Sequence, residues 1–341
     1  MIITTLGIDL GKTVCSIAGL DAAGTVVFRR RVRRWRLLKV LSEIPACTVA
    51  MEACCGAHHI ARACEKMGHQ ARLMPAHYVK PYVKVRKNDD RDAEAIAEAS
   101  TRPTMSFVAV KSEAQLDLQA IHRQRERLIG QRTQLINQLR AFLMDRGVLV
   151  AKGRRAFEKA LSSFLAERRD VVSPSMLALL TDSTEELRLL NERIGRIDQS
   201  LAEVAKTDEV VLRLTEIPGI GPLTASALVA AIGDGRAFAR GRDLSAWLGL
   251  VPRQISTGGK AKLIGISKRG NTYLRKLFIH GARAVLHLVR DRSAPMLEWV
   301  DALKKRRHVN VTAVALANKL ARIAWAVVAN NTRYDRRMAA G

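Results

Sequence analysis

Residues 3–11 read ITTLGIDLG, an apolar run that ends in an aspartate and a glycine turn. Its length, its β-branched residues and the closing glycine predict a buried strand followed by a tight turn. Two further strands are expected at residues 12–21 and 24–33, with a hairpin turn at residues 21–24. The chain therefore begins with three adjoining strands of one sheet.

Strand and helix patterns alternate after this hairpin. Residues 47–56 predict a fourth strand, residues 58–67 a helix and residues 71–75 a short fifth strand. Residues 88–100, rich in alanine and acidic side chains, predict a second helix. Adjoining strands followed by this alternation indicate a mixed α/β sheet with helices on its faces, which we assign to residues 1–110.

The central region has a helical pattern instead. Apolar residues recur every seven positions within residues 112–146, and steps of three and four alternate from Leu187 to Val204. This a/d spacing is typical of a coiled coil within or between chains, or equally of a plain helical hairpin inside one subunit. We assign residues 111–206 to this region and expect its loosest connection at residues 150–174.

Positive charge is concentrated in the last third of the chain. The 341 residues include 57 Lys and Arg against 32 Asp and Glu, a net charge of +25, and residues 206–341 contribute +15 of it. The expected partner is a polyanion, with nucleic acid preferred to an anionic membrane and a generally basic surface as the plainer alternative. We see neither a run of about 18 apolar residues nor a secretory leader, so we expect a cytoplasmic protein without a membrane span.

Two features of residues 207–341 indicate phosphate contacts. IPGIGPLTASALVAAIGD, at 217–234, resembles a helix-hairpin-helix, in which amides near Gly219 and Gly221 approach a phosphate at a helix start. PRQISTGGKAK, at 252–262, is a polar loop that alone indicates only a phosphate contact or a solvated turn. The cations that we expect to bind nucleic acid here are Arg253, Lys260, Lys262, Lys268, Arg269 and Arg275.

Four carboxylates belong to elements that we expect to meet at one edge of the sheet. Asp9 ends the first strand, Glu52 ends the fourth, and Asp89 and Asp92 lie three residues apart at a helix start. Converging carboxylates repel one another unless a cation lies between them, and oxygen ligands without Cys or His suit Mg²⁺ or Mn²⁺. The four residues therefore predict a metal site of the kind that cleaves phosphodiesters.

Surface ion pairs are the alternative explanation of this acidic stretch. Asp90 and Glu94 are spaced i,i+4 and can face Arg86 and Arg91. We expect both arrangements, with Asp90 and Glu94 outward and the other two aspartates of the helix inward.

A zinc site is not expected. The five cysteines contain no C-x-x-C pair, and the spacing of Cys54, Cys55, His58 and His59 does not suit a tetrahedral ion. We expect the two adjacent cysteines to be buried and unbridged.

These motifs together resemble the DEDD transposases of the insertion-sequence 110/1111 family. The resemblance rests on GIDLGK at 7–12, MEACCGAHH at 51–59 and KNDDRDAEAIAEA at 87–99, and on the stretches at 217–234 and 248–282. It implies a ribonuclease H-like (RuvC-like) N-terminal domain, a helical coiled-coil linker and a mainly α C-terminal transposase domain in residues 207–341. It also implies that the metal-binding catalytic tetrad is Asp9, Glu52, Asp89 and Asp92.

The resemblance gives the polar loop a chemical role as well. Family members carry a nucleophilic serine there, which attacks DNA and forms a covalent link to the phosphate. Their pattern has serine immediately before the glycine, whereas this chain has Thr257 there and Ser256 one position earlier. Because a primary hydroxyl is less hindered than a secondary one, we favour Ser256 over Thr257 as the nucleophile.

The resemblance further implies partners. They are DNA (element ends and target), a non-coding guide RNA of the bridge type and further copies of the chain in a dimer or tetramer, all in the bacterial cytoplasm at the nucleoid. Two other functions stay open. A junction-resolving nuclease would use only the metal site, without a covalent intermediate. An actin-like ATPase or sugar kinase would also begin with GIDLGKT, but we find neither the second phosphate loop nor the adenosine motif that it needs.

Overall fold

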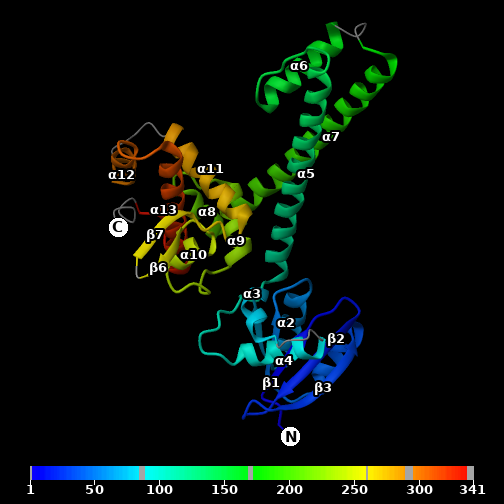
Figure 1. The fold of residues 1–341 in the computed structure, drawn as a ribbon, viewed down its shortest axis with the longest axis vertical. Coiled ribbons are helices and arrows are strands. Elements are labelled where there is room, and N and C mark those ends of the chain that lie inside the picture. Colours follow the sequence, from blue (N-terminus) through cyan, green and yellow to red (C-terminus); the bar gives the residue numbers. More distant parts are fainter. Residues whose placement is uncertain (1, 84–88, 168–171, 259, 289–294, 336–341) are drawn as a thin grey trace. The chain divides into compact units, whose positions relative to one another are not determined.

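The computed structural model describes residues 2–83, 89–167, 172–258, 260–288 and 295–335 (Figure 1). Its contacts separate two compact units, which are residues 1–113 and residues 114–341. The further division of the second unit into a helical region and a C-terminal domain stays a prediction.

The first unit contains a five-stranded mixed sheet in the order β3-β2-β1-β4-β5. The first three strands pair antiparallel, whereas β4 and β5 continue from β1 in parallel. Parallel neighbours need a crossover, and helices supply it here. The mixed α/β sheet with helical connections is as predicted. The strands are β1 (Thr5–Asp9), β2 (Val14–Leu20), β3 (Val26–Arg33), β4 (Thr48–Glu52) and β5 (Gln70–Met74), and the helices are η1 (Arg34–Arg36), α1 (Leu37–Ser42), α2 (Ala57–Lys66), α3 (Ala76–Val79), η2 (Lys80–Tyr82) and α4 (Asp89–Ser100).

The two faces of this sheet pack against different helices. Side chains alternate along a strand, so Leu6 and Ile8 of β1 enter the core with α1 and α2, while Gly7 faces α4. A Cβ at Gly7 would stand 2.2 Å from the carbonyl oxygen of Ala93 and 2.8 Å from the Cβ of Ala97. The glycine of β1 and the alanines of α4 therefore allow an unusually close contact between strand and helix.

The second unit is mainly helical, with one two-stranded antiparallel ribbon. The elements that follow the first unit are α5 (Glu113–Met144), α6 (Arg154–Glu167), α7 (Pro174–Thr207), α8 (Glu209–Thr215), α9 (Pro222–Ile232), α10 (Gly241–Trp247), β6 (Pro252–Thr257), β7 (Lys260–Ile266), α11 (Thr272–Leu288), α12 (Pro295–Lys304) and α13 (Val309–Ala329).

The predicted a/d seam is used inside the chain. Leu128 of α5 and Leu187 and Ile194 of α7 belong to one buried cluster, as that spacing requires. The prediction of a loose connection at residues 150–174 is wrong, because α6 lies there and buries Phe157 completely in the same cluster. Three helices, rather than two, thus share this core.

A separate core joins the helices from α8 to α13, and α13, the longest of them, contributes many of its buried residues. By length and composition α13 could cross a membrane, contrary to the expectation that no such segment is present. In the structure, 61% of its apolar window is buried, with Leu316 and Leu320 fully covered. Such burial is typical of a core helix in a globular domain.

Candidate active site

Three of the four predicted metal ligands lie at one edge of the sheet. Ile8 and Met51 are register partners of the parallel strands β1 and β4, so the following residues, Asp9 and Glu52, end those strands side by side. Strand alternation places both on the face that α4 covers. The close packing of α4 on β1 brings Asp92, in its first turn, to the same edge.

These carboxylates act on one another electrostatically. Burial raises the pKa of Glu52, and the charges of Asp9 and Asp92 raise it further. Like charges held together in this way favour a cation between them. Among the residues that the structure describes, no three Asp, Glu, His or Cys side chains form a closed ligand set as they stand. The side chain of Asp89, the fourth predicted ligand, lies outside those residues, although its backbone begins α4.

Arg34 belongs to this edge and was missed in the sequence. Its guanidinium donates from Nη1 to the Gly11 carbonyl at 2.7 Å and from Nη2 to the Cys55 carbonyl at 3.1 Å. It thereby ties the turn after β1 to the turn after β4. Gly56 leaves room for it, since a Cβ there would stand 2.2 Å from Nη2. In the sequence Arg34 is hidden in the basic run of residues 29–36, and only the neighbouring strand ends identify it.

The turn after β4 is exposed, contrary to the prediction for its cysteines. Cys54 and Cys55 lie in the turn that follows β4, and both are exposed. The nearby His58 ring accepts a hydrogen bond from the Lys111 amide at 3.1 Å, and burial lowers its pKa. His58 therefore anchors the segment that leads out of the unit.

Glu94 pairs with a residue far away in the sequence. Its Oε1 accepts from Arg29 Nε of β3 at 2.6 Å, and its side chain is only 22% exposed. The expectation that Glu94 faces outward is therefore wrong, because it pairs with a strand of the sheet. The side chain of Asp90 and the whole of Arg86 lie outside the described residues, so that predicted local pair stays a prediction.

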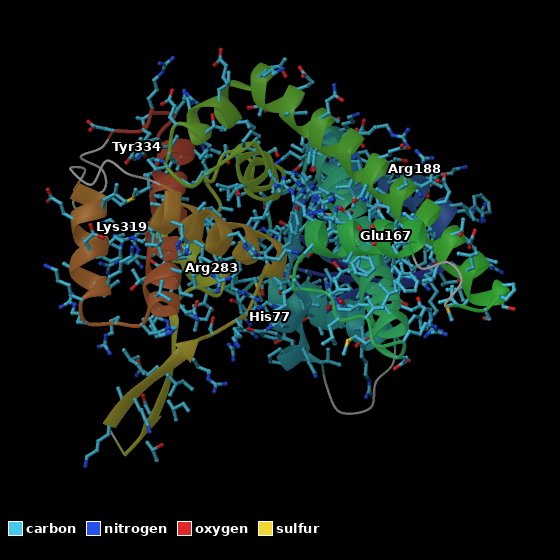
Figure 2. The ribbon with its side chains drawn as sticks, turned by 90° about the horizontal axis from the view of Figure 1, so that it is seen from above. His77, Glu167, Arg188, Arg283, Lys319 and Tyr334 are labelled. Atoms are coloured by element: carbon cyan, nitrogen blue, oxygen red, sulfur yellow. The ribbon has the colours of Figure 1, made fainter. Side chains whose placement is uncertain are left out.

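The ribbon of β6 and β7 carries both candidate nucleophiles and is exposed along β6 (Figure 2). Its register pairs Ser256 with Ala261 and Thr257 with Lys260. Because successive side chains of a strand point to opposite faces, the two hydroxyls lie on opposite sides of the ribbon. Gln254 shares the side of Ser256 and donates from Nε2 to its Oγ at 2.7 Å.

The predicted cations of the ribbon lie on one side of it. Arg253, Ile255 and Thr257 alternate along β6 and therefore point to the same face. Lys262 is the cross-strand partner of Ile255, and Lys260 is the partner of Thr257. All three cations therefore share the face of Thr257. Ser256 has uncharged cross-strand neighbours, so the local cations alone do not surround it.

Arg275 holds the base of the ribbon. It is buried, and its Nη1 donates to the carbonyls of Leu248 at 2.9 Å and Arg269 at 2.8 Å, while Nη2 donates to Thr272 Oγ1 at 3.1 Å. The predicted cations Lys268 and Arg269 are exposed beside it. The structure thus gives Arg275 a positioning role, whereas Lys268 and Arg269 present their charges to solvent.

The two glycines between α8 and α9 differ in their surroundings. Gly219 has a φ of +90°, and a Cβ there would stand 2.9 Å from the carbonyl oxygen of Gly281 in α11. It is required for backbone packing between the turn and α11. Gly221 precedes Pro222 at the start of α9, is exposed and has open space around its Cβ position. Of the two, Gly221 is the one that a phosphate could approach.

Comparison with known proteins identifies the family. A DEDD-type model of IS110 proteins, described as "Transposase", matches residues 6–146, and "Transposase IS116/IS110/IS902 family" matches residues 211–295. A probable family 20 transposase of Pseudomonas aeruginosa is 44% identical over 98% of this chain and 99% of its own length. The transposases for IS1328 of Yersinia enterocolitica and IS1111A of Coxiella burnetii are 42% and 43% identical, over 98% and 97% of this chain and 99% and 91% of theirs. The chain therefore belongs to the IS110/IS1111 family of transposases, enzymes that recombine DNA.

Proposed function

We propose that this transposase excises and inserts its own insertion sequence by a two-part mechanism, with a carboxylate metal site and a serine nucleophile. The observation that carries the proposal is the meeting of Asp9, Glu52 and Asp92 at one sheet edge, where burial and the two neighbouring charges raise the pKa of Glu52. Three converging acids have no evident use in a protein that only binds DNA.

We propose a ribonuclease H-like, RuvC-like fold for the first unit. The strand order β3-β2-β1-β4-β5, antiparallel in its first half and parallel in its second, supports it, as do the acids that end β1 and β4. For the turn between α8 and α9 we propose a helix-hairpin-helix, supported by the open position of Gly221 at a helix start.

Asp9, Glu52, Asp89 and Asp92 would hold Mg²⁺ or Mn²⁺. Their oxygen donors fit these ions, and the raised pKa of Glu52 fits a site that lacks positive charge within it. When bound, such ions stabilise negative charge on the phosphate and on the leaving oxygen. The four carboxylates would position them, and Arg34 would keep the strand ends that carry two of these carboxylates at a fixed spacing.

Ser256 would be the nucleophile. Its Oγ attacks phosphorus, an Oγ–P bond forms, one bridging P–O bond breaks, and the departing oxygen takes up a proton. The hydrogen bond from Gln254 Nε2 supports this assignment, because a donor to Oγ stabilises the developing alkoxide and leaves the hydroxyl proton free to depart. Thr257, on the other face, remains the second candidate.

The proposed partners follow the charge and the family. DNA ends, target DNA and an element-encoded guide RNA would all bind a chain of net charge +25. We propose that it acts as a dimer or tetramer in the bacterial cytoplasm, at the nucleoid and without a membrane anchor. The exposure of the ribbon supports assembly, since a hydroxyl on an exposed ribbon needs surroundings that exclude water.

The test is a cleavage assay on labelled element-end DNA with the element's transcript and Mg²⁺, resolved on a denaturing protein gel. We expect a labelled protein–DNA adduct with the wild type and Thr257→Ala, and none with Ser256→Ala or Asp9→Ala. An adduct that survives Ser256→Ala but not Thr257→Ala would move the nucleophile to the other face. Cut DNA without any adduct would indicate a metal-only nuclease.

A further inference from the structure

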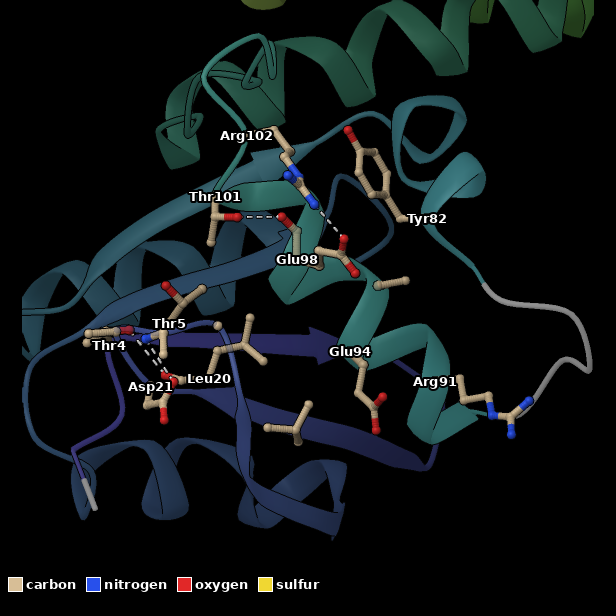
Figure 3. A pocket seen from close by; sticks show the side chains of 15 residues that line it. Thr4, Thr5, Leu20, Asp21, Tyr82, Arg91, Glu94, Glu98, Thr101 and Arg102 are labelled. Carbon is tan, nitrogen blue, oxygen red and sulfur yellow. Dashed lines mark hydrogen bonds and ion pairs between the residues drawn. The ribbon is translucent and has the colours of Figure 1, made fainter.

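Two hollows in the structure differ in how their charges are balanced. The hollow in the first unit, of about 540 Å³, is lined by cations and acids from α4 (Figure 3). Glu98 pairs with Arg102 at 2.6 Å there, and Glu94 pairs with Arg29 at 2.6 Å. The two acids of α4 are thus matched by cations of the chain, and Asp21, the third acid of the lining, accepts from the backbone amides of Ala23 and Thr25. This hollow gives no reason to infer a charged ligand.

Among the residues that the structure describes, the hollow between α10 and α13, of about 330 Å³, is lined by four cations and by no acid. Arg240 and Arg242 contribute from the start of α10, and Lys319 and Arg322 from α13. Of the four, Arg240 has an acidic neighbour in Asp243, but at 3.7 Å and with its own side chain 75% exposed. We call these four residues and the space between them the α10–α13 hollow.

The walls of this hollow are firmly packed. A Cβ at Gly241 would stand 3.0 Å from the Cα and from the carbonyl oxygen of Arg322, so the two helices touch through backbone there. Ser245 Oγ also donates to the Asn318 carbonyl at 3.2 Å. The four charges are therefore carried on elements that cannot easily separate to relieve their repulsion.

Lys319 is the residue that points to a ligand. It is only 8% exposed, and burial and the neighbouring charge of Arg322 lower its pKa. Its Nζ lies 4.8 Å from the ring centroid of Trp299, and within the part of the chain that the structure describes it has no carboxylate partner. An aromatic ring offsets only part of the cost of burying an ammonium group. An anion in the hollow would offset the rest and would also relieve the repulsion from Arg322.

We propose that the α10–α13 hollow binds a backbone phosphate of a nucleic-acid strand, at a site separate from the carboxylates and from the ribbon. Arginine side chains match the geometry of phosphate oxygens, and a buried ammonium adds a point charge. Trp325 also lines the hollow, and its indole N–H donates to the Gly235 carbonyl at 3.1 Å, which fixes the ring. Cations beside a fixed aromatic ring are typical of sites that bind single strands. The proposal rests on nucleic acid as the partner, and not on the metal or serine chemistry.

The experiment measures binding of the full-length protein to a labelled single-stranded element-end oligonucleotide, in EDTA, over a range of salt concentrations. Each lost phosphate contact lowers the slope of log K against log salt by about 0.7. We expect that decrease with Arg322→Gln and with Lys319→Met, whereas Arg322→Lys keeps the charge and the slope. Arg193→Gln removes an exposed cation of α7, outside the hollow, and should leave the slope unchanged.

Two results would overturn the proposal. One is a slope that is the same in the wild type and both hollow variants, or one that Arg193→Gln lowers equally. The other is an unchanged slope together with thermal stabilisation by inorganic phosphate that Arg322→Gln abolishes, which would make the hollow a site for the free ion. Melting curves of each variant verify folding. Since no cleavage is measured, failure of the adduct assay would not affect this outcome.

Discussion

A buried histidine should make the second unit sensitive to mild acid. His122 of α5 lies with its Nδ1 3.1 Å from Tyr273 Oη of α11 and its Nε2 3.1 Å from Ser226 Oγ of α9. Burial, with a smaller effect of the Arg125 charge, lowers its pKa from 6.5 to about 4. The folded state therefore holds this imidazole neutral at pH values where the unfolded chain binds a proton.

The size of the effect follows from the two pKa values. A difference of roughly 2.5 pKa units corresponds to about 3.4 kcal/mol, because one unit is worth about 1.36 kcal/mol. The folded-state pKa is the lower one, so this stability is complete above pH 6.5 and is lost as the pH falls from 6.5 towards 4. By about pH 5, we expect about 2 kcal/mol to be lost through His122 alone.

Urea unfolding at pH 7.5 and pH 5, for the wild type and His122→Gln, provides the assay. Tryptophan fluorescence reports mainly on the second unit, which holds Trp247, Trp299 and Trp325. At pH 7.5 the variant should be less stable, by about 1–3 kcal/mol for the unsatisfied partner groups. At pH 5 that gap should shrink by about 2 kcal/mol. Parallel pH dependences in the two proteins would refute the reasoning, since the other ionisable groups are common to both.

Three further predictions concern the first unit and the helical core. Gly56→Ala should weaken Mn²⁺ binding measured by calorimetry and raise the Mn²⁺ concentration needed for cleavage, because its Cβ would displace Arg34. Gly68→Ala is the matched control, because Gly68 has a φ of +85°, close to the +88° of Gly56, but open space around its Cβ position. An equal effect of the two substitutions would contradict a role for Arg34. Glu52→Gln should raise the Tm in EDTA, because the raised pKa of Glu52 indicates that its negative charge is unfavourable in the folded state. The same substitution should abolish cleavage. A lower Tm would argue against repulsion among the carboxylates. Phe157→Ala should cost about 3–5 kcal/mol in urea unfolding, and a loss below about 1 kcal/mol would mean that α6 does not share the core.

Local rules explain which parts of the fold could be predicted. Strand alternation and turn chemistry are properties of a few neighbouring residues, so the sheet and the carboxylates that end its strands could be placed from the sequence. Helix periodicity predicted the face of the helix on which Asp92 lies. What brings Asp92 close to the strand ends is the packing of α4 against Gly7, a tertiary contact that the sequence pattern does not reveal.

The remaining features depend on contacts between distant segments. Arg34 and Arg275 are ordinary members of basic stretches in the sequence, and their carbonyl partners come from other elements. The helix α6 was missed because its apolar positions, which include Phe157, are interrupted by charged residues that look like a linker. The separation of the ribbon's two hydroxyls required a defined register, which no local pattern supplies.

Ser256 and Thr257 point to opposite faces of the ribbon. An alignment of this loop with a relative therefore also specifies the face on which the serine lies. Placing the serine one position later would move the proposed attacking oxygen to the other side of the ribbon and change the direction from which it meets a phosphate. The double exchange Ser256→Thr with Thr257→Ser keeps the composition and moves the primary hydroxyl from one face of the ribbon to the other. Two proteins that differ only in the order of these residues would therefore need to present opposite faces of the ribbon to the same DNA strand.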